Sequence, residues 1–490
     1  MAEDILYKAG QNIGEFTDYD RSGTAQTIDT GDLRRKYDFG DRVSELSIAQ
    51  DPFFRLVSKL AKKPTDDPQF KFTERRGSWS KRYAYLVDHG SSFNAGLSAN
   101  ADSQDDSGNT WYGKFGTDYS SEGNVTNIFG QTVDYQVGDD KTKPIFFMKD
   151  QLIRVPVASA DNSGNNQAVV DYAVVKVSDV ADSGNYVQVT GTVVKGHSAS
   201  QFYMGIPAGL TGTKTASQSE EALAPYKCFV IGSVFDKGTG YPDSWKDQPF
   251  ITDYGQTQIW KTSMAMTNTD RATVLKYEGN EWARIWKEKL IEHKYDIEQS
   301  LLFGSQHGTM RTTQGAVDWI IRNGNLFSWD DTKTADAFLN DMSALLDPRY
   351  GGSAGTVFFC STAVYNWLHR LGGYFKNNIG ISDQFRADLA VAGRKKVLGL
   401  DMTTISTAYG DMNIVRNIHL DGTNIAIMGV DLKHCAYRPL VGNGVNRDTS
   451  IYVGVQTLEN SGVDRRVDQI LTEAGMEWSM PEKHAIWKNG

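Results

Sequence analysis

The chain has 490 residues, of which 40% are hydrophobic, and it carries 60 acidic side chains against 51 basic ones. The apolar content excludes wholesale disorder, and the length allows about three domains of ordinary size. The net charge of -9 argues against a dedicated nucleic-acid-binding protein, which usually has a basic excess. No window approaches 18 consecutive apolar residues, so we expect no membrane-spanning helix.

The first residues are polar and rich in turn-forming types, and we expect an extended arm over about 40 residues. A short helix follows, with Asp51 as its N-cap and Pro52 at its first position. Its apolar face is predicted to contain Phe53, Leu56, Val57 and Leu60.

The stretch 90–222 differs from its surroundings because it is dense in Gly, Ser, Asp and Asn, with short apolar runs. Residues 169–177 and 186–194 have the β-branched composition of strands, and a turn signal lies between them. We therefore predict a β-rich module inserted over 90–222.

The strongest helical pattern covers residues 281–303. Asn280 is predicted as its N-cap, and Gly304 stands where a left-handed residue would end the helix. At 1.5 Å per residue, such a helix would span about 35 Å. We interpret its apolar stripe as part of the fold's core, made of Trp282, Trp286, Leu290, Ile297 and Leu301.

After this helix, helical and strand patterns alternate, which indicates an α+β architecture. Helices are predicted at 334–346 and 362–371. The predicted strands are 356–360, 402–407, 413–418, 424–428 and 450–458.

None of the common catalytic signatures holds. The letters of 351–355 match a nucleophile elbow, but that elbow needs a strand before it and a helix after it, and here the order is reversed. The eight histidines do not pair at metal-ligand spacing, and the acidic clusters at 102–106 and 139–140 lack the full calcium-loop pattern. We expect no enzyme, and no catalytic, cofactor-binding or metal-binding residues.

The three cysteines, Cys228, Cys360 and Cys435, are far apart in the sequence. An odd number without paired spacing predicts a reducing compartment and no disulfide framework. We expect each to be a small buried apolar residue.

A basic cluster with interleaved aromatic residues contains Arg75, Arg76, Trp79 and Arg82. Such a cluster can bind single-stranded nucleic acid, or it can form a protein interface, where Arg and Trp carry much of the energy. It can also be an ordinary exposed face. We take the four residues as candidate inter-subunit contacts, with the other two interpretations left open.

Residues 253–269 form an alternating run, and the long helix that follows closes on Asp296-Ile297-Glu298-Gln299-Ser300-Leu301-Leu302-Phe303-Gly304. This order resembles the major capsid proteins of tailed bacteriophages, in which a strand returns from an extended loop and enters a long spine helix. The runs 397–415, 426–440 and 452–458 are similar to the axial domain and the return to the peripheral domain in that family.

The resemblance implies an α+β fold of the Hong Kong 97 type, with an N-terminal arm, an extended loop, a spine helix, an axial domain and the inserted module. The expected segments are 1–60 (arm and short helix), 61–89 with 223–262 (extended loop and peripheral strands), 90–222 (inserted module), 263–345 (peripheral domain with the spine helix), 346–440 (axial domain) and 441–490 (return to the peripheral domain).

The resemblance also implies a coat protein that self-assembles into hexamers and pentamers of an icosahedral shell around double-stranded DNA. Its expected partners are further copies, portal, scaffold and decoration proteins and, without sequence specificity, the packaged DNA; no membrane and no cofactor is expected. Assembly would take place in the host cytoplasm, and the product would be the virion. The alternatives are a tail tube or β-rich tail component, and an enzyme with a β substrate-binding module. A mostly-β tail protein would not need the helix at 281–303.

Overall fold

The computed structural model describes a little under two thirds of the chain. The described residues are 51–75, 77, 82–88, 110–117, 136–137, 143–159, 169–183, 186–195, 202–204, 214–215, 227–242, 247, 250–274, 280–307, 310–330, 332–346, 356–368, 389–398, 400–407 and 409–489. The predicted arm, Arg76, Trp79, the run 351–355 and both acidic clusters lie outside them.

Contacts divide the chain into two units. The smaller one comprises 1–48 and 269–284, and its described part contains most of α5 (Asn268–Ala272) and the start of α6 (Glu281–Phe303). Within it, the Arg271 guanidinium lies 5.6 Å from the centroid of the Trp282 ring. All other described elements belong to the larger unit, which has three apolar cores.

One core lies inside an antiparallel sheet with the strand order β10-β2-β3-β7-β6-β5-β8. Because β10 also pairs with β5, six of these strands form a ring, and we call this element the closed sheet. Its strands are β2 (Tyr83–Asp88), β3 (Thr110–Gly116), β5 (Gln151–Ser159), β6 (Val169–Ser183), β7 (Tyr186–Lys195), β8 (Phe202–Met204) and β10 (Lys227–Ser233). It therefore takes in β2 and β10, which the sequence assigned to the flanking segments.

Two strands connect the closed sheet with the rest of the chain, and we call them the ribbon. β1 (Gln69–Arg75) enters the closed sheet and β11 (Phe250–Gln256) returns from it. The two strands pair antiparallel along their whole length, so Arg75 stands opposite Phe250. A separate short pair is formed by β4 (Gln136–Val137) and β9 (Lys214–Thr215).

A four-stranded antiparallel sheet follows the ribbon, and we call it the spine sheet. Its central strand, β23 (Arg465–Trp478), pairs over ten residues with β12 (Gln258–Thr267). Along its other edge β23 pairs first with β22 (Ser450–Gln456) and then with β19 (Cys435–Pro439). Short elements near it are β20 (Val441–Gly442), β21 (Val445–Asn446) and α10 (Leu458–Ser461).

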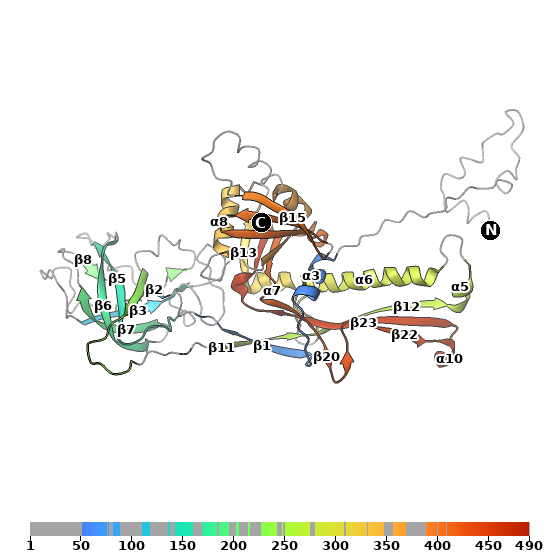
Figure 1. Ribbon diagram of the computed structural model, residues 1–490, viewed down its shortest axis with the longest axis horizontal. Coiled ribbons are helices and arrows are strands. Elements are labelled where there is room, and N and C mark those ends of the chain that lie inside the picture. The colour runs from blue at the N-terminus through green and yellow to red at the C-terminus, as the bar shows by residue number, and fades with distance from the viewer. Residues whose placement is uncertain are drawn as a thin grey trace, which may run out of the picture. The chain divides into compact units, whose positions relative to one another are not determined.

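The long helix lies where the sequence predicts it, with α6 running from Glu281 to Phe303. Its C-terminal half lies against β12 and β23 (Figure 1), since His293 contacts Thr262 and Thr472. The predicted N-cap is confirmed because Asn280 Oδ1 accepts a hydrogen bond from the backbone N–H of Ala283 at 3.2 Å. The left-handed conformation expected at Gly304 is wrong, and glycine is needed there for space: a Cβ would lie 2.4 Å from the carbonyl oxygen of Ser300.

A mixed sheet of seven strands contains the strand order β13-β24-β18-β14-β17-β16-β15. Its strands are β13 (Asn325–Trp329), β14 (Thr356–Cys360), β15 (Leu389–Val397), β16 (Leu400–Thr407), β17 (Gly410–Arg416), β18 (Ile425–Asp431) and β24 (Ala485–Asn489). β14 is buried on both faces, because Val357 and Phe359 belong to one core and Phe358 and Cys360 to another. The last strand of the chain, β24, belongs to this sheet and not to the spine sheet.

Helices cover the mixed sheet and the junction with the spine sheet. They are α3 (Pro52–Leu60), α7 (Ala316–Asn323), α8 (Ala335–Leu345) and the 3-10 turns η7 (Ile418–Leu420) and η8 (Pro481–Lys483). α8 packs beside β13 (Figure 1), with the Phe338 and Trp329 rings 6.3 Å apart. The predicted face of α3 is correct for its first three members, but Leu60 is 57% exposed because it stands in the last turn, beyond the core. Helices and sheets together confirm the α+β class.

Candidate assembly site

Two members of the predicted contact cluster lie at the junction of the ribbon and the closed sheet. Arg75, at the end of β1, is exposed; its guanidinium lies 3.5 Å from the Asp247 carboxylate and 5.2 Å from the centroid of the Phe250 ring. Arg82 is half-buried just before β2, and its carbonyl accepts a hydrogen bond from the N–H of Val230. These positions leave the inter-subunit role of the cluster a prediction.

The predicted stripe of α6 is buried only toward its C-terminal end. Ile297 and Leu301 have no exposed surface, whereas Trp282, Trp286 and Leu290 are half-buried. The buried side also carries two polar residues that the apolar stripe omitted, His293 and Glu298. Their spacing from the stripe was visible in the sequence, but an acidic side chain on a helix is ordinarily exposed.

Glu298 connects three distant parts of the chain. Its Oε1 accepts hydrogen bonds from the N–H of Phe53 and from Nδ2 of Asn417, both at 3.1 Å. Its Oε2 accepts the N–H of Phe54 at 2.5 Å. Glu298 therefore caps the N-terminus of α3 from 245 residues away, and Asn417 joins the same carboxylate to the end of β17.

Asp51 has the position that was predicted for it but not the capping role. It precedes α3 as the N-cap residue, yet its side chain makes no capping hydrogen bond. Its carboxylate pairs with Arg55 one turn later instead. The free N–H groups at the start of α3 attract a negative group, and the side chain that fills this place comes from α6.

Burial and hydrogen bonding act on Glu298 in opposite directions. Burial in the core raises the pKa of its carboxyl group to about 7, with a smaller upward contribution from the charge of Asp51. The N–H groups of Phe53 and Phe54 and the amide of Asn417 favour the ionised form and lower the pKa. The protonation of Glu298 is therefore linked to the seating of α3 on α6.

His293 makes the second polar contact between α6 and the spine sheet. Its Nδ1 lies 2.8 Å from Oγ1 of Thr262 in β12, and its Nε2 lies 2.8 Å from Oγ1 of Thr472 in β23. The side chain is 1% exposed, and burial lowers its pKa, so the imidazole is held neutral. One helical residue thus ties both strands of the longest pair to α6.

The ribbon crosses β23 at two glycines. A Cβ on Gly255 of β11 would lie 3.2 Å from the carbonyl oxygen of Met476 in β23, and a Cβ on Gly475 of β23 would lie 2.4 Å from the carbonyl oxygen of Gln256. The side chain of Glu74 adds a further link, because its Oε1 accepts the N–H of Met480 at 2.9 Å. The base of the ribbon is therefore held against the spine sheet by close backbone contact.

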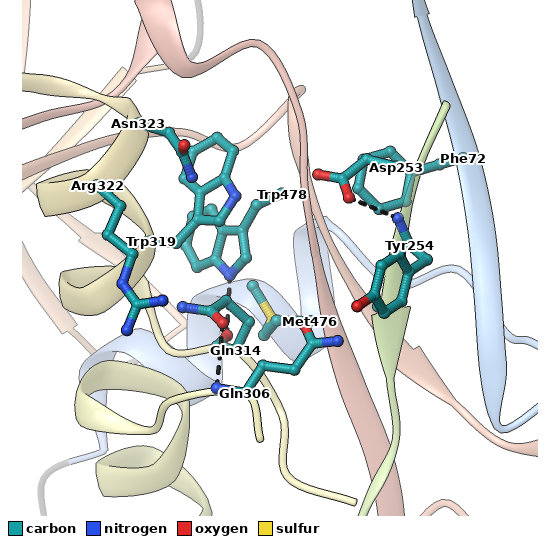
Figure 2. A pocket seen from close by; sticks show the side chains of 11 residues that line it. Phe72, Asp253, Tyr254, Gln306, Gln314, Trp319, Arg322, Asn323, Met476 and Trp478 are labelled. Carbon is teal, nitrogen blue, oxygen red and sulfur yellow. Dashed lines mark hydrogen bonds between the residues drawn. The ribbon is translucent and has the colours of Figure 1, made fainter. Parts of the chain in front are cut away.

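A cleft of about 270 Å³ lies between the ribbon and α7 (Figure 2). The rings of Trp319 and Trp478 stack at its inner end with centroids 5.6 Å apart, and Nε1 of Trp478 donates to the carbonyl of Gln314 at 3.0 Å. Asp253 and Tyr254 stand on the opposite side, on β11. The cleft is slightly smaller than typical ligand pockets. Asp253 is the carboxylate in its lining, which contains no cysteine, histidine, serine or threonine.

The described residues offer little for metal or redox chemistry. Within the described ranges, no three or more His, Cys, Asp and Glu side chains are grouped to hold a metal ion. All three cysteines are buried, as the sequence predicts, and burial raises the pKa of each thiol. None of the helices in the described part is long and apolar enough to cross a membrane.

Solved structures, with a phage capsid among them, share weak similarity with this chain. A structure from Gordonia phage Cozz is 11% identical, with 53% of this chain and 78% of that chain aligned at a TM-score of 0.34. The capsid of the cyanophage P-SCSP1u is 9% identical, with 53% and 81% aligned at a TM-score of 0.36. A virus-like particle from Pyrococcus furiosus is 12% identical, with 48% and 78% aligned at a TM-score of 0.29. TM-scores this low do not establish a common fold.

The family comparison is more specific. No curated protein sequence matches the chain. Residues 247–489, however, match the family model described as SU10 major capsid protein. The matched residues run from the start of β11 to the end of β24 and so contain the whole spine sheet, α6 and the mixed sheet. Through this part of its sequence the chain is identified as a major capsid protein of the tailed-bacteriophage family.

Proposed function

We propose that this capsid protein assembles into hexamers and pentamers, which close into an icosahedral shell around double-stranded DNA. The observation that carries the proposal is the coincidence of the family match with one structural block. Residues 247–489 form the spine sheet, the long helix and the mixed sheet, and the closed sheet lies outside the match. The block that matches the family is thus the part of the chain that would form the shell.

In this proposal each element has a place in the Hong Kong 97-type architecture. The mixed sheet corresponds to the axial domain, the spine sheet with α6 to the peripheral domain, and the ribbon to the extended loop. Residues 1–60 would be the arm with its short helix α3, and the closed sheet would be an inserted module between the two ribbon strands.

Different surfaces at the edges of such a subunit favour head-to-tail contacts, which close into rings when the rotation allows it. Single contacts can be weak while the shell is stable, because a subunit leaves only when several contacts break together. The cluster Arg75, Arg76, Trp79 and Arg82 is placed at one such contact. Further proposed partners are portal, scaffold and decoration proteins, with assembly in the host cytoplasm.

Electron microscopy of the purified full-length chain tests the proposal. Shells, or discrete hexameric and pentameric rings, are expected after concentration. Tubes or fibres would instead support a tail component, and small discrete particles at all concentrations would contradict self-assembly. Sedimentation of the same samples checks that the particles are formed by most of the protein and not by a minor fraction.

A further inference from the structure

The outer edge of the spine sheet carries an unusually apolar surface, which we call the edge patch. Six large apolar side chains in 451–463 are each more than two fifths exposed. They are Ile451, Tyr452, Val453 and Val455 of β22, Leu458 of α10, and Val463 before β23. The neighbouring strand β23 is buried by comparison, with Ile470 at 3% and Leu471 at 7% exposure.

β22 is an edge strand, since β23 is the strand that it pairs with in the described part of the chain. Exposed apolar edges promote association between chains, and soluble proteins ordinarily protect them with charges or cover them. Contiguous apolar patches of a few hundred Å² on a single chain mark interaction sites. The edge patch is therefore a surface at which association with another protein is expected.

The geometry of β22 favours side-chain packing over addition of another strand. Its register against β23 shifts between Tyr452 and Gln456, and Gly454 in this bulge has a φ of 68°. The N–H of Gly454 is bound at 2.7 Å by Oδ1 of Asp468, so it is not available to a neighbouring strand. A bulge interrupts the regular ladder that strand addition needs, while it leaves Val453 and Val455 exposed.

The charges around the edge patch indicate a protein partner and not DNA. Glu459 and Asp464 are exposed beside it, and Arg465 and Arg466 follow directly. Both arginines are engaged within the chain, Arg465 with the side chain of Gln456 and Arg466 with Asp468. An apolar centre with a rim of both signs is typical of protein interfaces, whereas DNA-binding surfaces are predominantly basic.

We propose that the edge patch is a contact between copies of this chain, in which it packs against apolar side chains of a second copy in the shell. The inference rests on the proposed self-assembly, which supplies identical chains as the most abundant partner. A standard interface has about 20 to 30 residues on each side around an apolar core. The six apolar side chains of the edge patch would contribute to such a core.

Thiol labelling tests this proposal without disturbing the fold. Since the three native cysteines are buried, Val453→Cys would add the accessible thiol. The matched control is Val194→Cys in the closed sheet, where the valine is 50% exposed against 64% for Val453. We expect a maleimide to react with the first variant at least tenfold more slowly in assembled particles than in dissociated subunits, with little change for the control.

A charge variant supplies the second measurement. Val453→Asp with Val455→Asp is expected to give folded subunits, with an unchanged circular dichroism spectrum, that lose at least tenfold in particle yield. Val194→Asp should assemble normally. Two results would overturn the edge patch and leave the proposed function intact, provided that the wild type forms shells. In the first, Val453→Cys is labelled equally fast in assembled particles and in dissociated subunits. In the second, Val453→Cys and Val194→Cys are protected equally by assembly. A wild type that never forms particles would overturn both the edge patch and the proposed function.

Discussion

The closed sheet and the spine sheet handle their edges in opposite ways. In the closed sheet, pairing of β10 with β5 gives each of six strands a neighbour on both sides, and the apolar core lies inside the ring. In the spine sheet, β22 ends the ladder with Ile451, Val453 and Val455 exposed. A sheet closed on itself pairs its own strand edges and can be inserted into a chain without a partner, whereas an exposed apolar edge favours association between chains.

The family match follows the same division. Residues 247–489 contain the open spine sheet, and the sealed sheet lies between β1 and β11, outside the match. The ribbon and α3 are the connections between the shared block and the N-terminal half, and both are fixed by specific contacts. The strength of these contacts decides how independent the two regions are.

The largest change in the free energy of unfolding is expected from the titration of Glu298. Its unfolded pKa is near 4.5 and its folded pKa is about 7, so between these values the folded chain binds the proton and the unfolded chain does not. The free energy of unfolding should therefore fall as pH rises from 4.5 to 7, by about 3 kcal/mol from this group. Glu298→Gln lacks this contribution, and urea unfolding of both proteins across this range measures the difference.

The comparison between wild type and variant cancels the other titrating groups, including His484, whose pKa is lowered to about 4 by burial. Asp336→Asn serves as the control, since this carboxyl stands in the first turn of another helix, α8. A wild type that gains stability over Glu298→Gln as pH rises would show that the three N–H donors outweigh burial. The seating of α3 would then be strongest with the carboxylate ionised.

The second effect concerns the base of the ribbon. Gly475→Ala places a Cβ 2.4 Å from the carbonyl oxygen of Gln256, and backbone cannot yield as a flexible side chain would. Overpacking of this kind costs about 1–3 kcal/mol, and the ribbon should detach from β23. Thermal unfolding measures the cost, and faster proteolysis near β11 reports the detachment. Gly232→Ala in β10, where a Cβ meets nothing within 4 Å, should be close to neutral; equal losses in both would refute the close-contact explanation.

The smallest effect is expected from removing the closed sheet altogether. Arg75 and Phe250 are paired across the ribbon, so a two-residue Asn-Gly turn can replace residues 76–249 and close a hairpin. Because the closed sheet has its own core, the unfolding midpoint of the remaining chain should change by only a few degrees. Failure of the shortened chain to fold would show that the closed sheet and the spine sheet are not independent of each other.

Much of the fold could be predicted because the signals are local. The bounds of α6, its cap at Asn280 and the doubly buried β14 follow from periodicity and capping residues within one element. The buried stripe of α6 was predicted too long. Periodicity reports which side of a helix is apolar, but not how far along the helix the sheet extends. Trp282, Trp286 and Leu290 are half-buried for this reason.

The sequence by itself determined the helix at 281–303, the short helix after Asp51, several of the strands and the burial of the unpaired cysteines, and it carried the resemblance to tailed-phage major capsid proteins. Only the tertiary structure decided that Glu298 caps α3, that β10 closes a ring with β5, and that β24 joins the mixed sheet. These contacts join residues up to 245 positions apart. Hydrogen bonds and burial at that separation leave no periodic trace in the chain, since the partner of each group is set by where the folded elements meet.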